Sequence, residues 1–239
     1  MDRTPYAKLA AHYDLGWGDF AESSRTFIER TLSAYGVESG RILELASGTG
    51  ILAIHLARSG HSVVGIDLSP EMVAIASMKG KRVKGAEFTV ADMRNPGLEP
   101  GFDAVLCLFD SLNYLMTLED VSETLRSVSS LLREKGVFVF DFNRPLIYSA
   151  HNGETLKRHV EDGVLHQELH YEASQRIART VFRFPDGDVE THNQRAYEMD
   201  EIAPLLQSAG LSLKDCYSDF GRRSVSSLSE RLICVCQKG

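Results

Sequence analysis

One stretch of the sequence decides the predicted fold, namely RILELASGTGILAIHL at residues 41–56. The apolar run Arg41–Leu45 predicts a short buried strand, and the small residues Ala46–Gly50 predict a tight turn before a helix that begins at Ile51. Glycine lets the backbone turn sharply and lets a ligand approach the main chain closely. The first turn of a helix presents free N–H groups and a positive dipole end. The stretch therefore predicts a site for a carboxylate or phosphate group.

A second predicted strand, Ser62–Asp67, ends in an acid about 20 residues after Glu44. In nucleotide-binding βαβ units, an acid at this position accepts both hydrogen bonds of a ribose diol. The spacing Glu44-x-Ala46-x-Gly48-x-Gly50 fits the G-x-G-x-x-G fingerprint of dinucleotide sites poorly. The two strands therefore indicate a nucleotide-type site of another kind.

Further predicted elements continue the alternation of strand and helix. The expected strands are 86–91, 102–109, 136–143, 211–219 and 231–237, and the expected helices include 21–35 and 202–209. Only about ten residues separate the third strand from the fourth, which is short for a parallel crossover. We therefore expect the helix at this crossover to be missing or one turn long.

Residues 153–197 interrupt this α/β order. Apolar and polar residues alternate over 164–171, 176–184 and 189–197, and a turn signal at Pro185–Asp188 separates the last two runs. Alternation between turn signals is typical of antiparallel strands. The sequence therefore predicts an inserted, three-stranded antiparallel β-meander.

Length and composition set limits on the class of protein. The 239 residues suit one domain with an insertion, and 43% hydrophobic residues suffice for a sizeable core. No apolar run approaches the roughly 18 residues of a membrane span, and the first residues lack the apolar segment of a secretion signal. The four cysteines form no C-x-x-C pair, so we expect a reduced, cytoplasmic protein. The net charge of −7 argues against a general nucleic-acid surface.

The pattern Glu44-x-Ala46-x-Gly48-x-Gly50 resembles motif I of the class I S-adenosylmethionine (SAM)-dependent methyltransferases. Ala46 stands where that motif most often has glycine, and alanine is comfortable only at negative φ. The order of elements over residues 21–239 resembles the same family throughout. The resemblance implies a Rossmann-like α/β fold, with a seven-stranded, mostly parallel sheet whose last strand is antiparallel.

The phrase Asp110-Ser-Leu-Asn-Tyr-Leu115 and the inserted meander resemble a branch of small methyltransferases that includes glycine/sarcosine and amino-sugar N-methyltransferases. The resemblance implies methyl transfer to a small-molecule acceptor, at an amine nitrogen. The alternatives are C- or O-methylation of a small metabolite, tRNA methylation, and a non-catalytic SAM-binding regulatory module. The sequence Phe109-Asp-Ser-Leu112 lacks an N/D-P-P-Y/F motif, which argues against the DNA and glutamine methyltransferases.

The resemblance also divides the chain. It implies a lid segment at residues 1–20, a SAM-binding domain at residues 21–152 and 198–239, and a substrate cap at residues 153–197. We expect the cap to cover the mouth of the site, and the alternative is a surface through which two copies form a homodimer.

For the cofactor SAM, the resemblance implies that Asp67 holds the ribose hydroxyls and that Asp92 meets the adenine amino group. Glu44 either touches the ligand or braces the turn. The full set of expected cofactor residues is Tyr13, Glu44, Ala46, Ser47, Gly48, Gly50, Asp67, Leu68, Met72, Asp92, Met93, Leu108 and Phe109. Trp17 and Arg195 are expected at the substrate.

A base helps an amine acceptor, because the nitrogen reacts only after it has lost its proton. The candidate bases near the expected substrate mouth, which the sequence does not rank, are Asp110, Tyr114, His170 and His192. His166 and His170 share one face of a predicted strand without a third ligand, so no metal is expected.

Overall fold

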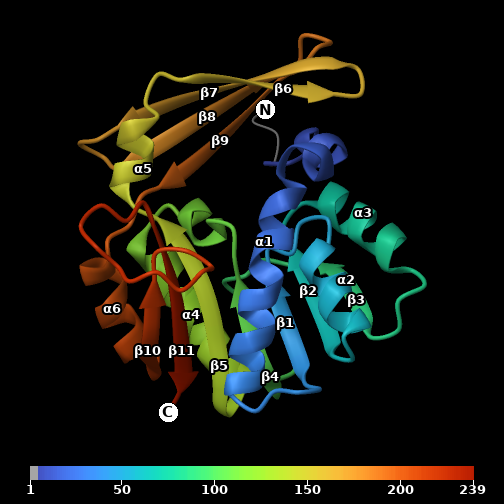
Figure 1. Ribbon diagram of the computed structural model, residues 1–239, viewed down its shortest axis with the longest axis vertical. Helices are drawn as coiled ribbons and strands as arrows, with labels where there is room; N and C mark the ends of the chain where they lie inside the picture. Colours follow the sequence, from blue (N-terminus) through green and yellow to red (C-terminus); the bar gives the residue numbers. More distant parts are fainter. Residues whose placement is uncertain (1–4) are drawn as a thin grey trace.

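Figure 1 shows the two sheets of the computed structural model, which describes residues 5–239. The larger sheet has seven strands in the order β10-β11-β5-β4-β1-β2-β3. Neighbours among β1 to β5 run parallel, whereas β11 runs antiparallel to both β5 and β10. The predicted seven-stranded sheet with an antiparallel last strand is therefore confirmed. Its strands are β1 Arg41–Leu45, β2 Ser62–Asp67, β3 Ala86–Val90, β4 Phe102–Cys107, β5 Leu132–Asn143, β10 Leu211–Tyr217 and β11 Arg231–Lys238.

Helices cover both faces of this sheet (Figure 1). Because successive strand residues point to opposite faces, Val137 and Val139 of β5 pack with α1 and α2, whereas Phe138 and Phe140 pack with α4 and α6. None of the described helices is long and apolar enough to span a membrane. The helices are η1 Leu9–His12, α1 Tyr13–Ala34, α2 Ile51–Arg58, α3 Pro70–Gly80, η2 Ser111–Tyr114, α4 Leu118–Leu131, α5 Pro145–Ala150 and α6 Met199–Ser208.

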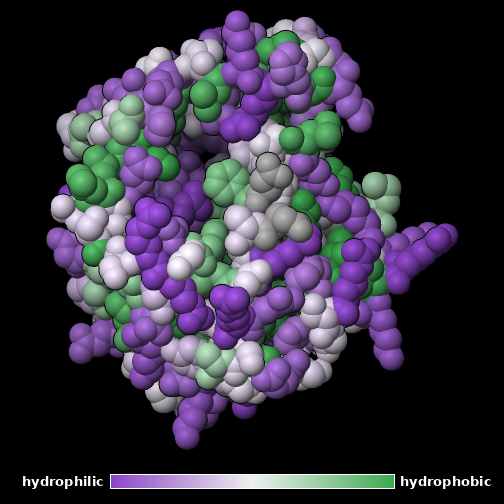
Figure 2. All heavy atoms as spheres, in the orientation of Figure 1, coloured by the Kyte–Doolittle hydropathy of each residue, from purple (hydrophilic) through white to green (hydrophobic). Residues whose placement is uncertain are grey.

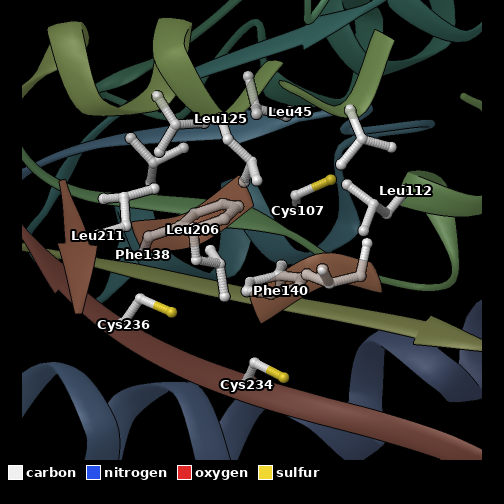
Figure 3. Packing of buried hydrophobic residues seen from close by; sticks show 14 of the residues in the cluster. Leu45, Cys107, Leu112, Leu125, Phe138, Phe140, Leu206, Leu211, Cys234 and Cys236 are labelled. Atoms are coloured by element: carbon white, nitrogen blue, oxygen red, sulfur yellow. The ribbon is translucent and has the colours of Figure 1, made fainter. Parts of the chain in front are cut away.

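The largest part of the core lies on the α4 and α6 face of the sheet, and Figure 3 shows its centre. The rings of Phe138 and Phe140 stack with centroids 4.8 Å apart. Cys107, Cys234 and Cys236 are buried in the same cluster as free thiols. Buried thiols of this kind act as small apolar side chains, so these cysteines contribute to packing.

Two of the element boundaries that differ from the prediction lie close to the site. Helix α1 begins at Tyr13, so the expected boundary after residue 20 falls inside a helix. Gly16 and Gly18 weaken the helical signal there, because glycine is a poor helix former. Strand β4 ends at Cys107, and the chain then turns through a left-handed φ of 62° at Phe109. The expected absence of a crossover helix is confirmed, since the described residues 91–101 form none.

The inserted sheet has four antiparallel strands rather than the predicted three (Figure 1). The additional strand, β6 Thr155–Val160, is an edge strand with the sequence TLKRHV. It is mostly exposed, so its sequence lacks the apolar alternation that marks the other three strands. Those strands are β7 Gly163–Glu172, β8 Ile177–Arg183 and β9 Val189–Arg195. We call β6 to β9 the cap sheet.

The buried side chain of Asn113 attaches the cap sheet to the main domain. Its Nδ2 donates to the carbonyl oxygens of Asn143, which precedes the insertion, and of Arg195, which ends it, at 2.9 and 2.8 Å. Its Oδ1 accepts the N–H of Asn143 at 2.8 Å. One amide therefore fixes both ends of the insertion to the loop after β4.

A comparison of Gly50→Ala with Gly36→Ala tests the packing of the turn before α2. Both glycines have a left-handed φ, 76° and 73° respectively. A Cβ at Gly50 would lie 2.7 Å from Phe88 and 3.0 Å from Ala76, whereas at Gly36 no described atom lies within 4 Å. We expect Gly36→Ala to lower the free energy of unfolding by about 1–2 kcal/mol. Gly50→Ala should lower the free energy of unfolding by about 1–3 kcal/mol more than Gly36→Ala in urea denaturation, because the added methyl group overpacks the turn. Equal losses in the two variants would contradict this packing.

Candidate active site

A pocket opens at the carboxyl ends of β1, β2 and β4. None of its described lining residues comes from the cap sheet, so the expected cover over its mouth stays a prediction. Figure 2 shows the surface hollowed between the cap sheet, at the top, and the main domain. One group of lining residues comes from the strand ends, and a second comes from the amino-terminal segment and α1. The expected cofactor and substrate residues that line it are Tyr13, Trp17, Glu44, Ala46, Ser47, Gly48, Asp67, Leu68, Met72, Asp92, Met93 and Phe109.

The turn after β1 leaves room for a ligand beside its main chain. Ala46, Gly48 and Gly50 have left-handed φ values of 50°, 54° and 76°. A Cβ at Gly48 would meet, among the described residues, only the edge of the Tyr13 ring at 4.0 Å. Gly50 is the N-cap of α2 and does not line the pocket. Ala46 thus holds the positive φ that is unfavourable for alanine, at a cost of about 1–2 kcal/mol.

Asp67 is braced inside the site and is only 8% exposed. Its two carboxylate oxygens accept the N–H groups of Gly48 and Ser69, each at 2.9 Å. Burial raises the pKa of Asp67, and the hydrogen bonds from Ser69 and Gly48 partly offset this rise. Because each oxygen has a further lone pair, the carboxylate retains acceptor positions for ligand hydroxyls. Asp67 therefore fixes the turn and also suits the ribose role expected of it.

Glu44 is buried, and its Oε2 has no hydrogen-bond partner among the described residues. Burial raises the pKa of Glu44 to about 8, although a hydrogen bond from the N–H of Ala53 in α2 acts to lower it. Ser47 Oγ, also on the pocket lining, is likewise buried without a partner in the described part of the chain. Orphaned polar atoms beside an open glycine turn fit a ligand with its own polar groups, as SAM has. Glu44 accepts a hydrogen bond from α2 and also lines the pocket, and its contact with a ligand stays a prediction.

Asp92 forms an ion pair at the edge of the pocket. Arg94 lies 2.6 Å from Asp92 through Nη2 and 2.7 Å from Asp120 through Nη1. The hydrogen bond from Arg94 lowers the pKa of Asp92. All three side chains line the pocket. The adenine contact expected of Asp92 stays a prediction.

Leu108 and Arg195 are further expected site residues that lie away from the pocket lining. Leu108 is buried in the core with α1 and α2, because the chain turns only at the next residue, Phe109. It therefore does not border the expected methionine end of a cofactor. Arg195 pairs with Glu201 at 2.9 Å and stacks 4.8 Å from the centre of the Tyr197 ring. These contacts hold its guanidinium at the base of the cap sheet.

Among the candidate bases, Asp110 is engaged by two partners. Its Oδ1 accepts from Arg231 at 2.9 Å, and its Oδ2 accepts from Gln194 at 2.6 Å. Arg231 also pairs with the buried carboxyl of Asp141. Burial raises the pKa of Asp141 to about 6, although the positive charge of Arg231 acts to lower it. Nothing local in the sequence singles out Arg231, because Asp110 lies 121 residues away along the chain.

The other three candidate bases lie in different settings. His170 is 60% exposed on β7 and does not line the pocket. Tyr114 lines the pocket, and its hydroxyl lies 2.8 Å from Nδ1 of His192 on β9. The structure therefore brings Tyr114 and His192 together. Sequence reasoning did not propose Tyr6 as a site residue, although this aromatic side chain also lines the pocket.

Comparison with known proteins identifies the family. Residues 42–136 match the model of a family described as a methyltransferase domain. The putative methyltransferase YqeM of Bacillus subtilis is 34% identical over 210 residues, which cover 84% of this chain and 85% of that protein. The chain belongs to the SAM-dependent methyltransferases. The family predicted from the motif turn is confirmed.

This methyltransferase is also similar to N-methyltransferases. The glycine/sarcosine N-methyltransferase of Aphanothece halophytica is 29% identical over 86% of this chain and 78% of that protein. The dTDP-3-amino-3,6-dideoxy-alpha-D-glucopyranose N,N-dimethyltransferase of Streptomyces fradiae is 26% identical over 87% of this chain and 85% of that protein. The crystal structure of a SAM-dependent methyltransferase from Clostridium acetobutylicum aligns with a TM-score of 0.85 at 24% identity, over 99% of this chain and all of the other.

The raised pKa of Glu44 predicts a specific pH dependence of stability. A carboxyl whose pKa is higher in the folded than in the unfolded chain stabilises the fold while it is protonated. This contribution is complete below about pH 4.5 and is lost as the pH rises towards 8. In urea denaturation without ligand, we expect Glu44→Gln to remove this decline and to exceed the wild type in stability at high pH. Glu87→Gln, at an exposed position of β3, is the control and should follow the wild type. If the free energy of unfolding changed with pH in the same way in all three proteins, the raised pKa of Glu44 would be contradicted.

Proposed function

We propose that this methyltransferase transfers the methyl group of SAM to an amine nitrogen of a small-molecule acceptor held beneath the cap sheet. The observation that carries the proposal is the mixed lining of one continuous pocket. The turn after β1 and the tip of β2 contribute polar and main-chain groups, and Tyr6, Tyr13 and Trp17 contribute aromatic rings. The first part suits the cofactor, and the second part suits an organic acceptor.

SAM brings an activated methyl group, so the protein has to bind, orient and desolvate the two reactants. Asp67 would hold the ribose hydroxyls, and Glu44 and Ser47 would meet polar groups of the methionine part with their orphaned oxygens. Met72, which is buried against the pocket, would border the adenine ring. These side chains come from the ends of β1 and β2 and the start of α3, which are rigid supports.

The aromatic part of the pocket favours an amine. Tyr13 and Trp17 stack with centroids 5.8 Å apart, and Tyr6 meets Tyr13 edge-on at 5.7 Å. Aromatic faces attract cations, such as a protonated amine, within about 6 Å of the ring centre, and the guanidinium of Arg158 already lies 4.2 Å from the centre of the Trp17 ring. The relatives named for glycine, sarcosine and an amino sugar support nitrogen as the methylated atom. The acidic net charge of −7 does not favour tRNA.

Ligand binding tests the cofactor assignment. SAM and its product S-adenosylhomocysteine should each raise the melting temperature, because a ligand at a hundredfold excess over Kd stabilises the fold by about 2.7 kcal/mol. Asp67→Asn should weaken SAM binding at least tenfold in calorimetry, since hydrogen bonds to a charged group contribute about 1.5–3 kcal/mol each. Asp103→Asn is the matched control, because that carboxylate binds the N–H of Arg41 at the opposite end of the sheet. Stabilisation by NAD and not by SAM would contradict the proposal.

Turnover tests the acceptor class. The protein is incubated with isotopically labelled SAM and a panel of glycine, sarcosine, amino-sugar nucleotides, other primary amines, phenols and quinols. We expect S-adenosylhomocysteine to form fastest with amines, and mass spectrometry should place the labelled methyl group on nitrogen. Transfer to carbon or oxygen alone would refute the choice of nitrogen. Binding of SAM without turnover of any acceptor would instead favour a regulatory module.

A further inference from the structure

Four hydrogen-bonded side chains lead from the pocket wall into the cap sheet. Tyr6 Oη lies 2.7 Å from Tyr114 Oη, and Tyr114 Oη lies 2.8 Å from His192 Nδ1. His192 Nε2 lies 2.6 Å from Glu190 Oε1. Both tyrosines line the pocket, whereas His192 and Glu190 are each 3% exposed. The chain therefore joins the pocket to a buried pair of an imidazole and a carboxylate.

Glu190 is held as an anion. Its oxygens accept the backbone N–H groups of Tyr6 at 2.8 Å, Lys8 at 2.7 Å and Leu9 at 3.3 Å. Burial acts to raise the pKa of Glu190, but the hydrogen bonds from His192 and from these N–H groups outweigh burial and lower it. An ionised carboxylate only accepts hydrogen bonds, so the proton between the two groups lies on His192 Nε2. The N–H of Tyr6, which also lies 3.3 Å from this nitrogen, then donates to Glu190 Oε1 at the shorter distance of 2.8 Å.

With the proton on His192 Nε2, all hydrogen bonds among the four side chains run in one donor-to-acceptor direction. A neutral imidazole protonated at Nε2 has a lone pair at Nδ1, which accepts the O–H of Tyr114. The Tyr114 oxygen then accepts the O–H of Tyr6, and the Tyr6 oxygen has lone pairs left for a donor in the pocket. Burial raises the pKa of both phenols well above their usual value, so they stay protonated and pass protons along without holding charge.

We propose that Tyr6, Tyr114, His192 and Glu190 form a proton relay that deprotonates the acceptor amine, and this proposal rests on the proposed function. An ammonium acceptor gives a proton to Tyr6 Oη as the Tyr6 proton moves to Tyr114 Oη and the Tyr114 proton moves to His192 Nδ1. The freed lone pair on nitrogen forms the N–C bond while the C–S bond of SAM breaks. The resulting imidazolium is stabilised by Glu190 and later returns its proton to water.

The relay joins three separate parts of the chain. Tyr6 belongs to the amino-terminal segment, Tyr114 to η2, and His192 and Glu190 to β9 of the cap sheet. Glu190 also fixes the amino-terminal segment through the N–H groups of residues 6, 8 and 9. The relay is therefore complete only while this segment is docked on the cap sheet. Removal of the proton from the acceptor thus requires the docked segment. A purely structural alternative is that the four side chains only fasten the segment.

The tautomer of His192 can be measured without any ligand. In ¹⁵N-labelled protein, the signals that disappear in His192→Gln belong to this imidazole, and we expect a proton on Nε2 and a hydrogen-bonded lone pair on Nδ1. Tyr114→Phe should shift the Nδ1 resonance. Tyr148→Phe is the matched control, because that phenol is buried and donates to Gln194 outside the relay. A proton on Nδ1, or an unshifted Nδ1 resonance in Tyr114→Phe, would overturn the relay. A failure of SAM binding would contradict the proposed function and leave this result intact.

Kinetics separate the relay from a structural role. With the amine that the panel identifies, Tyr6→Phe, Tyr114→Phe and His192→Gln should each lower kcat by about 10²-fold, the usual contribution of general base catalysis. KM and SAM affinity should not change in Tyr114→Phe and His192→Gln, and Tyr148→Phe should match the wild type. A normal kcat in Tyr114→Phe, or an equal loss in Tyr148→Phe, would overturn the relay.

Discussion

The carboxylate of Asp67 is the constraint on which the site depends. It joins the N–H of Gly48, in the turn after β1, to the N–H of Ser69, which caps α3 through its own hydroxyl. One side chain at the tip of β2 thereby positions the turn and the start of a second helix. The left-handed backbone at Ala46, Gly48 and Gly50 is held in this frame, so main-chain groups face the pocket without intervening side chains.

The part of the structure where we propose that the acceptor binds is built differently, from contacts between segments that are far apart in the sequence. Asn113 ties the cap sheet to the loop after β4, and Arg231 ties β11 to the same loop through Asp110. Glu190 ties the amino-terminal segment to β9. The geometry of this half comes from packing between these segments. This division explains how one family keeps its cofactor site while the acceptor varies.

The same division explains what the sequence predicts. The turn after β1 and the acid at Asp67 follow from local periodicity and spacing, so the sheet and the strand-end residues that line the pocket were predictable. Strand β6 was missed because it buries little, and the start of α1 was missed because Gly16 and Gly18 obscure a helix that tertiary contacts support. The contacts of Asp110 with Arg231 and of His192 with Tyr114 were unpredictable, because the partners lie 121 and 78 residues apart along the chain.

The two ends of the described chain lie at opposite ends of the molecule (Figure 1). Pro5 is part of the pocket lining, whereas β11 runs antiparallel to β5 and so ends beside the amino ends of the parallel strands. A fusion partner or surface tether attached after Gly239 would therefore emerge from the face opposite the pocket. The same attachment ahead of Pro5 would emerge at the pocket wall, so the carboxyl end is the suitable handle for immobilising this methyltransferase.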